Sequence, residues 1–408
     1  MLDVFGIKAI GVLCTSTIVF FLQKKFGNEE QGFYGVVSNS ILLFTVLCQF
    51  GIPSFTSLQI SINKKYNRSK VQKIIGRCIK ALLVIQPIFL PLIVYQSYNI
   101  LFDWYYCLLF STSIFLNVFI YFFAYILRGF NHYGWMIFLT ESLRWLIILI
   151  LLFSFNNVVE IQELIVHSIF TASLITFCVG FYRVRHLGFN LMKSIHVIKP
   201  KSVKGIVISS SAFVLSSFGV ICLQQMNIIQ LSYYRPLNDV GLFNFTYKYL
   251  AFSIIPVSVI SAKYAQIASE YFFQDKKEKV KKLLTNVTVV SFSITIISIL
   301  LLYLVSQYVY FYVNQVFDIK LYIILGFSMF TFSIYGFWIS FLVMVKKAKL
   351  TSIVLMIAVF SNLIINAIIT PKYSYIGTAI SDLASNLIAL ALCSYILINF
   401  SILERGKS

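Results

Sequence analysis

Residues 238–270 read NDVGLFNFTYKYLAFSIIPVSVISAKYAQIASE, the stretch around which the rest of the chain is organised. A polar start leads through Gly241 into a mostly apolar run that is long enough to cross a membrane. Lys248 lies inside that run. An ammonium group on a membrane-crossing helix is costly unless it faces a partner or a wet cavity, so Lys248 is a candidate functional residue.

The same pattern occurs once earlier in the chain. Residues 28–59 read NEEQGFYGVVSNSILLFTVLCQFGIPSFTSLQ. Aligning Gly32 with Gly241 sets an offset of 209 (241 − 32), which also places Asn39 on Lys248 in the alignment. Because this offset is close to half of the 408 residues, it predicts a duplicated membrane protein with a polar cavity between its halves.

The composition is that of a membrane protein. Hydrophobic residues make up 59% of the chain and charged residues 12%, and the mean hydropathy is +0.86. Soluble domains carry about 25% charged residues. The net charge of +19 would suggest nucleic acid in a soluble protein. Here the basic residues cluster between apolar runs, so membrane orientation explains them and no nucleic-acid partner is expected.

Twelve apolar runs approach or exceed the roughly 20 residues that a membrane span requires. The loops after the second, sixth, eighth and tenth runs are rich in Lys and Arg, whereas the loops between them are poor in both. The positive-inside rule therefore puts both termini in the cytoplasm. The runs are 4–23, 33–56, 78–98, 104–127, 134–155, 162–182, 205–233, 241–268, 283–311, 321–345, 350–370 and 375–400.

A basic loop at the midpoint of the chain divides these runs into two sets of six. The sequence predicts an N-terminal lobe over 1–187, a cytoplasmic linker over 188–204 and a C-terminal lobe over 205–408. An even number of spans in each lobe keeps the repeats in the same orientation, which gives a pseudo-two-fold axis along the membrane normal. The predicted fold class is an all-α polytopic membrane protein.

No enzyme signature occurs in the sequence. It contains no P-loop, GxSxG or HExxH motif and no acidic metal cluster, and its four His are scattered. The seven Cys include no CxxC pair and are odd in number, which disfavours metal and disulfide roles. We therefore expect no catalytic residue, no metal site and no cofactor. The first run lacks a cleavage site and is interpreted as a retained helix, not a signal peptide.

Polar residues inside the apolar runs are the candidate substrate-binding set. They fall on the first two runs of each half, where a polar face on each helix would line a wet cleft. The alternative for each is a hydrogen bond to a neighbouring helix, and for Lys8 an ammonium that reaches the membrane surface. The set comprises Lys8, Thr15, Asn39, Gln224, Asn227, Asn244 and Lys248.

Three charged residues lie in later runs. Glu141 and Arg144 are three residues apart on the fifth run, which places them on one helical face. One interpretation is an ion pair in which Glu141 and Arg144 neutralise each other. The other is functional, with Arg144 as an anion site or Glu141 as an ion-coupling carboxylate. Asp382 stands alone on the last run and is either a satisfied polar contact or a second candidate for ion coupling.

Four stretches resemble the polysaccharide-export branch of the multidrug/oligosaccharidyl-lipid/polysaccharide exporter superfamily, and the O-antigen flippases in particular. The stretch over 362–385 is the most specific, with an Asn-rich helix, Pro-Lys-Tyr and a small-residue helix. The four are EEQGFYGVVSNS (29–40), YILRGFNHYG (125–134), NDVGLFNFTYKYLAFSIIP (238–256) and NLIINAIITPKYSYIGTAISDLAS (362–385).

The resemblance implies a V-shaped, two-lobed transporter in the bacterial cytoplasmic membrane. Such a protein moves an undecaprenyl-pyrophosphate-linked oligosaccharide, for O-antigen, capsule or a similar glycan, to the outer leaflet of the bilayer. By position, Lys8 and Lys248, and then Arg144, would meet the pyrophosphate. Glycan polymerase and glycosyltransferases of the same pathway are the implied protein partners.

The chain departs from the family pattern at two places. The family often has an acidic residue in its seventh span, where this chain has Gln224, Gln225 and Asn227. It usually has a small or hydroxylic residue where this chain has Asp382. A cation-coupled drug or metabolite antiporter of the same superfamily is the alternative transporter, although the first four runs lack the central carboxylate that it would use. A scaffold for glycan assembly is the alternative without transport.

Overall fold

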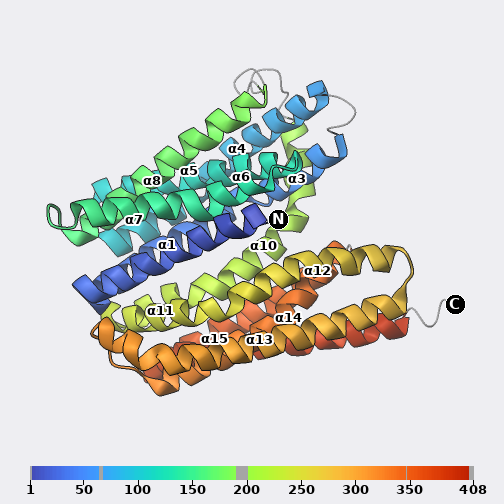
Figure 1. Ribbon diagram of the computed structural model, residues 1–408. Helices are drawn as coiled ribbons and strands as arrows, with labels where there is room; N and C mark the ends of the chain where they lie inside the picture. Colours follow the sequence, from blue (N-terminus) through green and yellow to red (C-terminus); the bar gives the residue numbers. More distant parts are fainter. Residues whose placement is uncertain (1, 64–67, 190–200, 346, 404–408) are drawn as a thin grey trace. The chain divides into compact units, whose positions relative to one another are not determined.

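The computed structural model describes residues 2–63, 68–189, 201–345 and 347–403. Within these ranges every regular element is a helix (Figure 1), which confirms the predicted all-α class. The predicted linker over 188–204 falls mainly on residues 190–200, which lie outside the described residues.

The first of two compact units comprises Met1–Phe21 and Val36–Ile221. Helix α5 is central to it, because α3, α4 and α8 all pack against α5 (Figure 1). Its helices, two of which continue into the second unit, are α1 (Leu2–Phe26), α2 (Asn28–Gln49), α3 (Ile52–Asn63), α4 (Arg68–Leu101), α5 (Trp104–Gly129), α6 (Tyr133–Ile137), η1 (Phe138–Ser142), α7 (Leu143–Phe155) and α8 (Ile161–His186).

Local chemistry fixes both ends of α5. At its start the Asp103 carboxylate accepts a hydrogen bond from the Tyr105 N–H at 2.7 Å, which caps the helix. At its end a Cβ on Gly129 would lie 2.8 Å from the Cβ of Ile60 on α3. Only a glycine permits this close packing of α3 against α5.

The second compact unit comprises Leu22–Gly35 and Cys222–Ser408. Helix α14 is its centre, with α11, α12, α13 and α15 packed against it (Figure 1). Apart from the turn that joins α1 to α2, its elements are α10 (Lys201–Tyr234), which begins in the first unit, α11 (Leu237–Ala251), η2 (Phe252–Ile254), α12 (Ile255–Phe273), α13 (Lys277–Tyr312), α14 (Ile319–Met344) and α15 (Ala348–Leu403).

Helix α15 consists of two helices joined at a sharp break. Ser374 has φ 53° and ψ −139°, which is not a helical conformation. Pro371 precedes the break and lacks the N–H that would continue the helical hydrogen bonds. After the turn the two parts pack closely, because a Cβ on Gly377 would lie 2.8 Å from the Ile369 carbonyl oxygen.

Ten helices of the described part are long and apolar enough to span a membrane. One of them, Lys349–Asn399, has 51 residues and contains the break at Ser374, so it is too long for a single crossing. Helix α10 is not among the ten. A multi-pass membrane protein is therefore confirmed, whereas the count of twelve spans stays a prediction.

Candidate functional site

Asp382 is the buried carboxylate of the second unit. It lies on the second part of α15 and is 3% exposed. Asn227 on α10 donates a hydrogen bond from its Nδ2 to Asp382 Oδ1 at 2.6 Å, and Ser328 on α14 donates its Oγ–H to Asp382 Oδ2. Three helices thus converge on one carboxylate through neutral donors.

The hydrogen bonds continue from Asp382 in two directions. On one side Asn366 Nδ2 donates to Asn227 Oδ1 at 3.4 Å and to Gln230 Oε1 at 3.0 Å. On the other side Asn386 Nδ2 donates to Ser328 Oγ at 2.7 Å. Among the described residues no cationic side chain forms an ion pair with Asp382. A membrane carboxylate with only neutral partners needs a cation or a proton to remove the cost of its charge.

The break in α15 creates this site, because it folds the two parts of the helix onto each other. Thr370 before the break and Thr378 after it have hydroxyl oxygens 3.0 Å apart. Two contacts hold the turn from outside: Arg235 Nη2 donates to the Pro371 carbonyl at 2.6 Å, and the Tyr375 hydroxyl donates to Asp318 Oδ2 at 3.0 Å.

Arg144 is the buried cation of the first unit, and its side chain is 5% exposed. Its Nη1 donates to Asn117 Oδ1 on α5 at 2.5 Å, and Asn117 Nδ2 donates in turn to Ser173 Oγ on α8 at 2.9 Å. The guanidinium also lies 4.4 Å from the ring centroid of Trp145. These contacts hold the planar guanidinium of Arg144 in one orientation.

Glu141 forms an ion pair with a residue of another helix. Its Oε2 lies 3.7 Å from Nζ of Lys8 on α1. Two further features hold α1 against this point: Ser142 Oγ donates to the Ile7 carbonyl at 2.6 Å, and a Cβ on Gly11 would lie 2.0 Å from the Glu141 carbonyl oxygen. The sequence pattern paired Glu141 with Arg144, but η1 is a π-helical turn, which changes the side-chain register between them.

The other predicted site residues differ in surroundings. Lys248 is half-buried and forms no hydrogen bond or ion pair within the described part of the chain. The Asn244 side chain is 1% exposed, and its amide has no hydrogen-bond partner among the described atoms. Thr15 Oγ1 donates to the Val12 carbonyl of its own helix at 2.8 Å, as hydroxyls in membrane helices commonly do. Asn39 is buried and Gln224 half-buried.

The structure brings some predicted residues together and leaves others apart. It joins Lys8 to Glu141 in the first unit and Asn227 to Asp382 in the second. Four polar residues that sequence reasoning did not select complete these clusters. The Asn-rich pattern of 362–385 was a signal for one of them, Asn366, whereas a single amide or hydroxyl elsewhere gave none. The four are Asn117, Ser328, Asn366 and Asn386.

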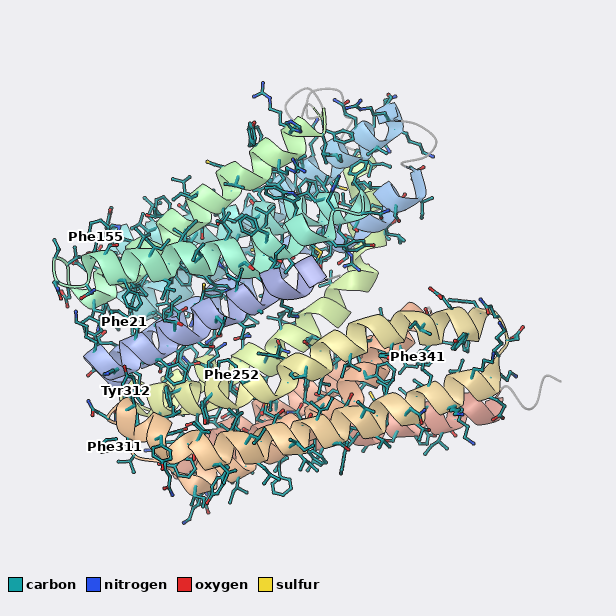
Figure 2. The ribbon with its side chains drawn as sticks, viewed as in Figure 1. Phe21, Phe155, Phe252, Phe311, Tyr312 and Phe341 are labelled. Atoms are coloured by element: carbon teal, nitrogen blue, oxygen red, sulfur yellow. The ribbon has the colours of Figure 1, made fainter. Side chains whose placement is uncertain are left out.

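The two aligned glycines of the sequence repeat meet in space. A Cβ on Gly32 would lie 2.1 Å from the Leu237 carbonyl oxygen, and a Cβ on Gly241 would lie 1.9 Å from the Asn28 carbonyl oxygen. Asn28 and Leu237 are themselves related by the offset of 209 (237 − 28). The crossing of α2 and α11 is therefore reciprocal, as in a two-fold contact. The side chains that cover the ribbons are drawn in Figure 2.

Comparisons with known proteins gave one matching family model and several solved structures of similar fold. A family model described as polysaccharide biosynthesis protein matches residues 10–265. The comparison with curated proteins gave no match.

Three solved structures illustrate the shared fold. An inward-facing multidrug resistance transporter of the MATE family in the MOP superfamily superposes with a TM-score of 0.77 at 13% identity, covering 98% of this chain and 96% of that chain. The lipid II flippase MurJ, in an inward closed conformation, gives a TM-score of 0.70 at 16% identity, covering 97% and 86%. A MOP superfamily transporter from Pyrococcus furiosus gives 0.62 at 13% identity, covering 99% and 96%.

These identities establish the fold alone, and the family rests on the match over residues 10–265. That match covers more than half of the chain, and the chain therefore belongs to the polysaccharide biosynthesis protein family.

Proposed function

We propose that this protein is a flippase that moves an undecaprenyl-pyrophosphate-linked oligosaccharide from the cytoplasmic to the outer leaflet of the bacterial inner membrane. The observation that carries the proposal is the buried guanidinium of Arg144, held on a membrane helix by the neutral Asn117. A buried guanidinium on a membrane helix is suited to an anionic group that enters from the membrane surface.

The chemistry of the substrate supports this assignment. A pyrophosphate cannot cross hydrocarbon unaided, because burial of its charge is expensive. Cationic side chains on the translocation path lower that cost, while the lipid tail stays in the bilayer. We assign this role to Arg144 and Lys248, with Lys8 as a third contact whose charge is shared with Glu141. The similarity to a lipid II flippase is a likeness of fold, and supports the proposal only in that sense.

We further propose that Asp382 couples transport to an ion. The resembled family often has an acidic residue on the seventh span, where this chain has Gln224, Gln225 and Asn227. The Asn227 amide donates to Asp382, so a carboxylate of the last helix contacts the predicted seventh span. A small cation or a proton that binds there would change the hydrogen bonds of three helices at once.

The orientation is part of the proposal. The lysine-rich loops support cytoplasmic termini, and reporter fusions at Lys204 and Ser408 should both report the cytoplasm. A periplasmic signal from either fusion would contradict the topology. Glycan polymerase and glycosyltransferases of the pathway are proposed as partners on the same membrane.

Deletion of the gene tests the function. In a strain with no related flippase, deletion should stop surface display of one glycan and leave its lipid-linked precursor facing the cytoplasm. Complementation with Arg144→Gln should restore protein in the membrane but little surface glycan. Normal surface glycan in the deletion strain would reject the function.

A cation-coupled drug or metabolite antiporter is a second candidate, and the buried Asp382 favours it. The two candidates differ in what deletion changes. An antiporter predicts altered drug susceptibility with unchanged surface glycan, whereas a flippase predicts the reverse. A scaffold for glycan assembly would retain surface glycan after substitution of the cationic residues.

A further inference from the structure

A pocket of about 580 Å³ opens at one end of the second unit. It is formed by the α12–α13 turn, the beginning of α13, one stretch of α14 and the end of α15. This volume lies within the range of about 300–1,000 Å³ that is usual for sites of small molecules. The pocket lies apart from Asp382 and its network, since none of those residues lines it.

The wall of the pocket is apolar and well packed. Phe341, labelled in Figure 2, is 2% exposed and meets the Phe272 ring edge-on at a centroid distance of 6.3 Å. Trp338 is held in place because its Nε1–H donates to Thr288 Oγ1 at 2.9 Å. The remaining apolar lining comes mainly from Val280, Leu284, Val289, Leu397 and Ile398.

The mouth of the pocket is charged and exposed. Lys277 and Lys281 line it together with Asp275 and Glu278. The segment Asp275–Lys282 reads DKKEKVKK, so five lysines outnumber two acids and its net charge is +3 (5 − 2). Lys281 has no hydrogen bond or ion pair within the described part of the chain, which leaves its ammonium available to a ligand.

The pocket lies where a membrane surface would be. Helices α13 and α14 and the stretch Lys349–Asn399 of α15 are all candidate spans. Only 17% of the apolar window of α13 is buried, so most of that window has room for contact with lipid. Lys277 and Lys281 stand in the first turns of α13, and the lining continues along this helix to Thr288, which accepts the hydrogen bond from Trp338. A charged mouth over an apolar wall matches a molecule with an ionic head and a hydrocarbon chain.

We propose that this pocket is a binding site for one anionic glycerophospholipid of the leaflet on the lysine-rich side. The phosphate group is held by Lys281 and Lys277, and one acyl chain lies along the wall beside Trp338 and Phe341. Anionic lipids of the cytoplasmic leaflet attract basic segments next to membrane spans, and the net charge of Asp275–Lys282 favours them over zwitterionic lipids. This proposal does not depend on the transported substrate.

Trp338 provides the measurement. The purified full-length protein is placed in phosphatidylcholine nanodiscs, and brominated phosphatidylglycerol or brominated phosphatidylcholine is added in increasing fractions. The signal of Trp338 is the difference in quenching between the wild-type protein and Trp338→Phe. We expect half-quenching at a fraction of brominated phosphatidylglycerol about fivefold lower than that of brominated phosphatidylcholine. This selectivity corresponds to the attraction of roughly one lysine for an anionic lipid.

Two double variants remove the same charge from the same segment. Lys277→Gln/Lys281→Gln should abolish the selectivity, whereas Lys279→Gln/Lys282→Gln, which removes lysines that do not line the pocket, should retain it. These positions are exposed, and an unchanged size-exclusion profile and Trp emission check that each variant folds.

Three results would overturn the proposal. Equal quenching by the two lipids would make the contact an ordinary one with surrounding lipid. An equal loss of selectivity in both double variants would assign it to the basic segment as a whole. Displacement of the quencher by a polyprenyl phosphate but not by unlabelled phosphatidylglycerol would identify the occupant as the lipid carrier of the substrate.

Discussion

The reciprocal glycine crossing of α2 and α11 makes a sharp prediction for Gly241→Ala. The new Cβ would lie 1.9 Å from the Asn28 carbonyl oxygen, whereas ordinary contact begins at 3.4 Å, so the backbones must separate by about 1.5 Å (3.4 − 1.9). Overpacking usually costs about 1–3 kcal/mol. Because the obstacle is backbone and not a flexible side chain, we expect a cost at the top of that range.

Thermal stability of the purified protein in detergent measures this cost, as the temperature of half-aggregation. A matched control is Gly326→Ala on α14, where the nearest atom, Cγ2 of Ile299, lies at 3.6 Å. The new Cβ has room at this position, and a glycine inside a helix is less stable than an alanine by about 0.5–1 kcal/mol. Gly326→Ala should therefore leave stability unchanged or raise it, while Gly241→Ala lowers it.

The reciprocity adds a second test. Gly32→Ala places a Cβ 2.1 Å from the Leu237 carbonyl oxygen, so it should cost nearly as much as Gly241→Ala. One separation of the helices relieves both clashes, so the double variant should cost clearly less than the sum of the two single variants. Refutation is simple: Gly241→Ala as harmless as Gly326→Ala, or two fully additive costs, would show that the helices do not cross in this way.

Three other predictions concern polar groups in the spans. Asn117→Ala should lower stability by about 1–3 kcal/mol in the same thermal assay, because it removes an acceptor of buried Arg144. Asp382→Asn keeps the shape of the side chain but removes the negative charge to which Asn227 and its neighbours donate. It should therefore abolish any dependence of glycan export on a sodium or proton gradient. Unchanged dependence would exclude Asp382 as the coupling group. Lys248→Ala should reduce surface glycan strongly at a normal protein level in the membrane, whereas Lys248→Arg should keep most of it; normal export by the alanine variant would remove Lys248 from the translocation path.

Much of the fold could be predicted because the length of each apolar run can be read directly from consecutive residues. The runs 350–370 and 375–400 place a break between them, and the structure breaks α15 at Ser374, just after Pro371. The lengths of the apolar runs could not show which residues belong to which compact unit. Residues Leu22–Gly35 belong to the second unit through contacts such as the hydrogen bond between Gln315 Nε2 and Asn28 Oδ1. These two residues are far apart in the sequence, and a hydrophobic pattern cannot show that they meet.

Some residues of the candidate site could be predicted from the sequence, but the pairs that they form could not. Asn227 and Asp382 were both selected as polar residues on apolar runs, yet they are 155 residues apart and their bond depends on how α10 meets α15. For Glu141 the local spacing named Arg144 on its own helix, and the close approach of α1 at Gly11 brings Lys8 to it as well. Spacing identifies which groups share a face, whereas tertiary packing decides which of them bind each other.

The repeat acquires a physical meaning where its two copies differ. The offset of 209 aligns Gly35 with Asn244, and a Cβ on Gly35 would lie 2.5 Å from Asn244 Nδ2, so these equivalent residues meet near the local two-fold relation of α2 and α11. Two asparagines could not occupy one such position, since the glycine of one copy makes room for the amide of the other. One turn later the offset aligns Asn39 with Lys248. In both aligned pairs the second copy of the pattern therefore carries the larger polar group, and Lys248 is the only cation among the four residues.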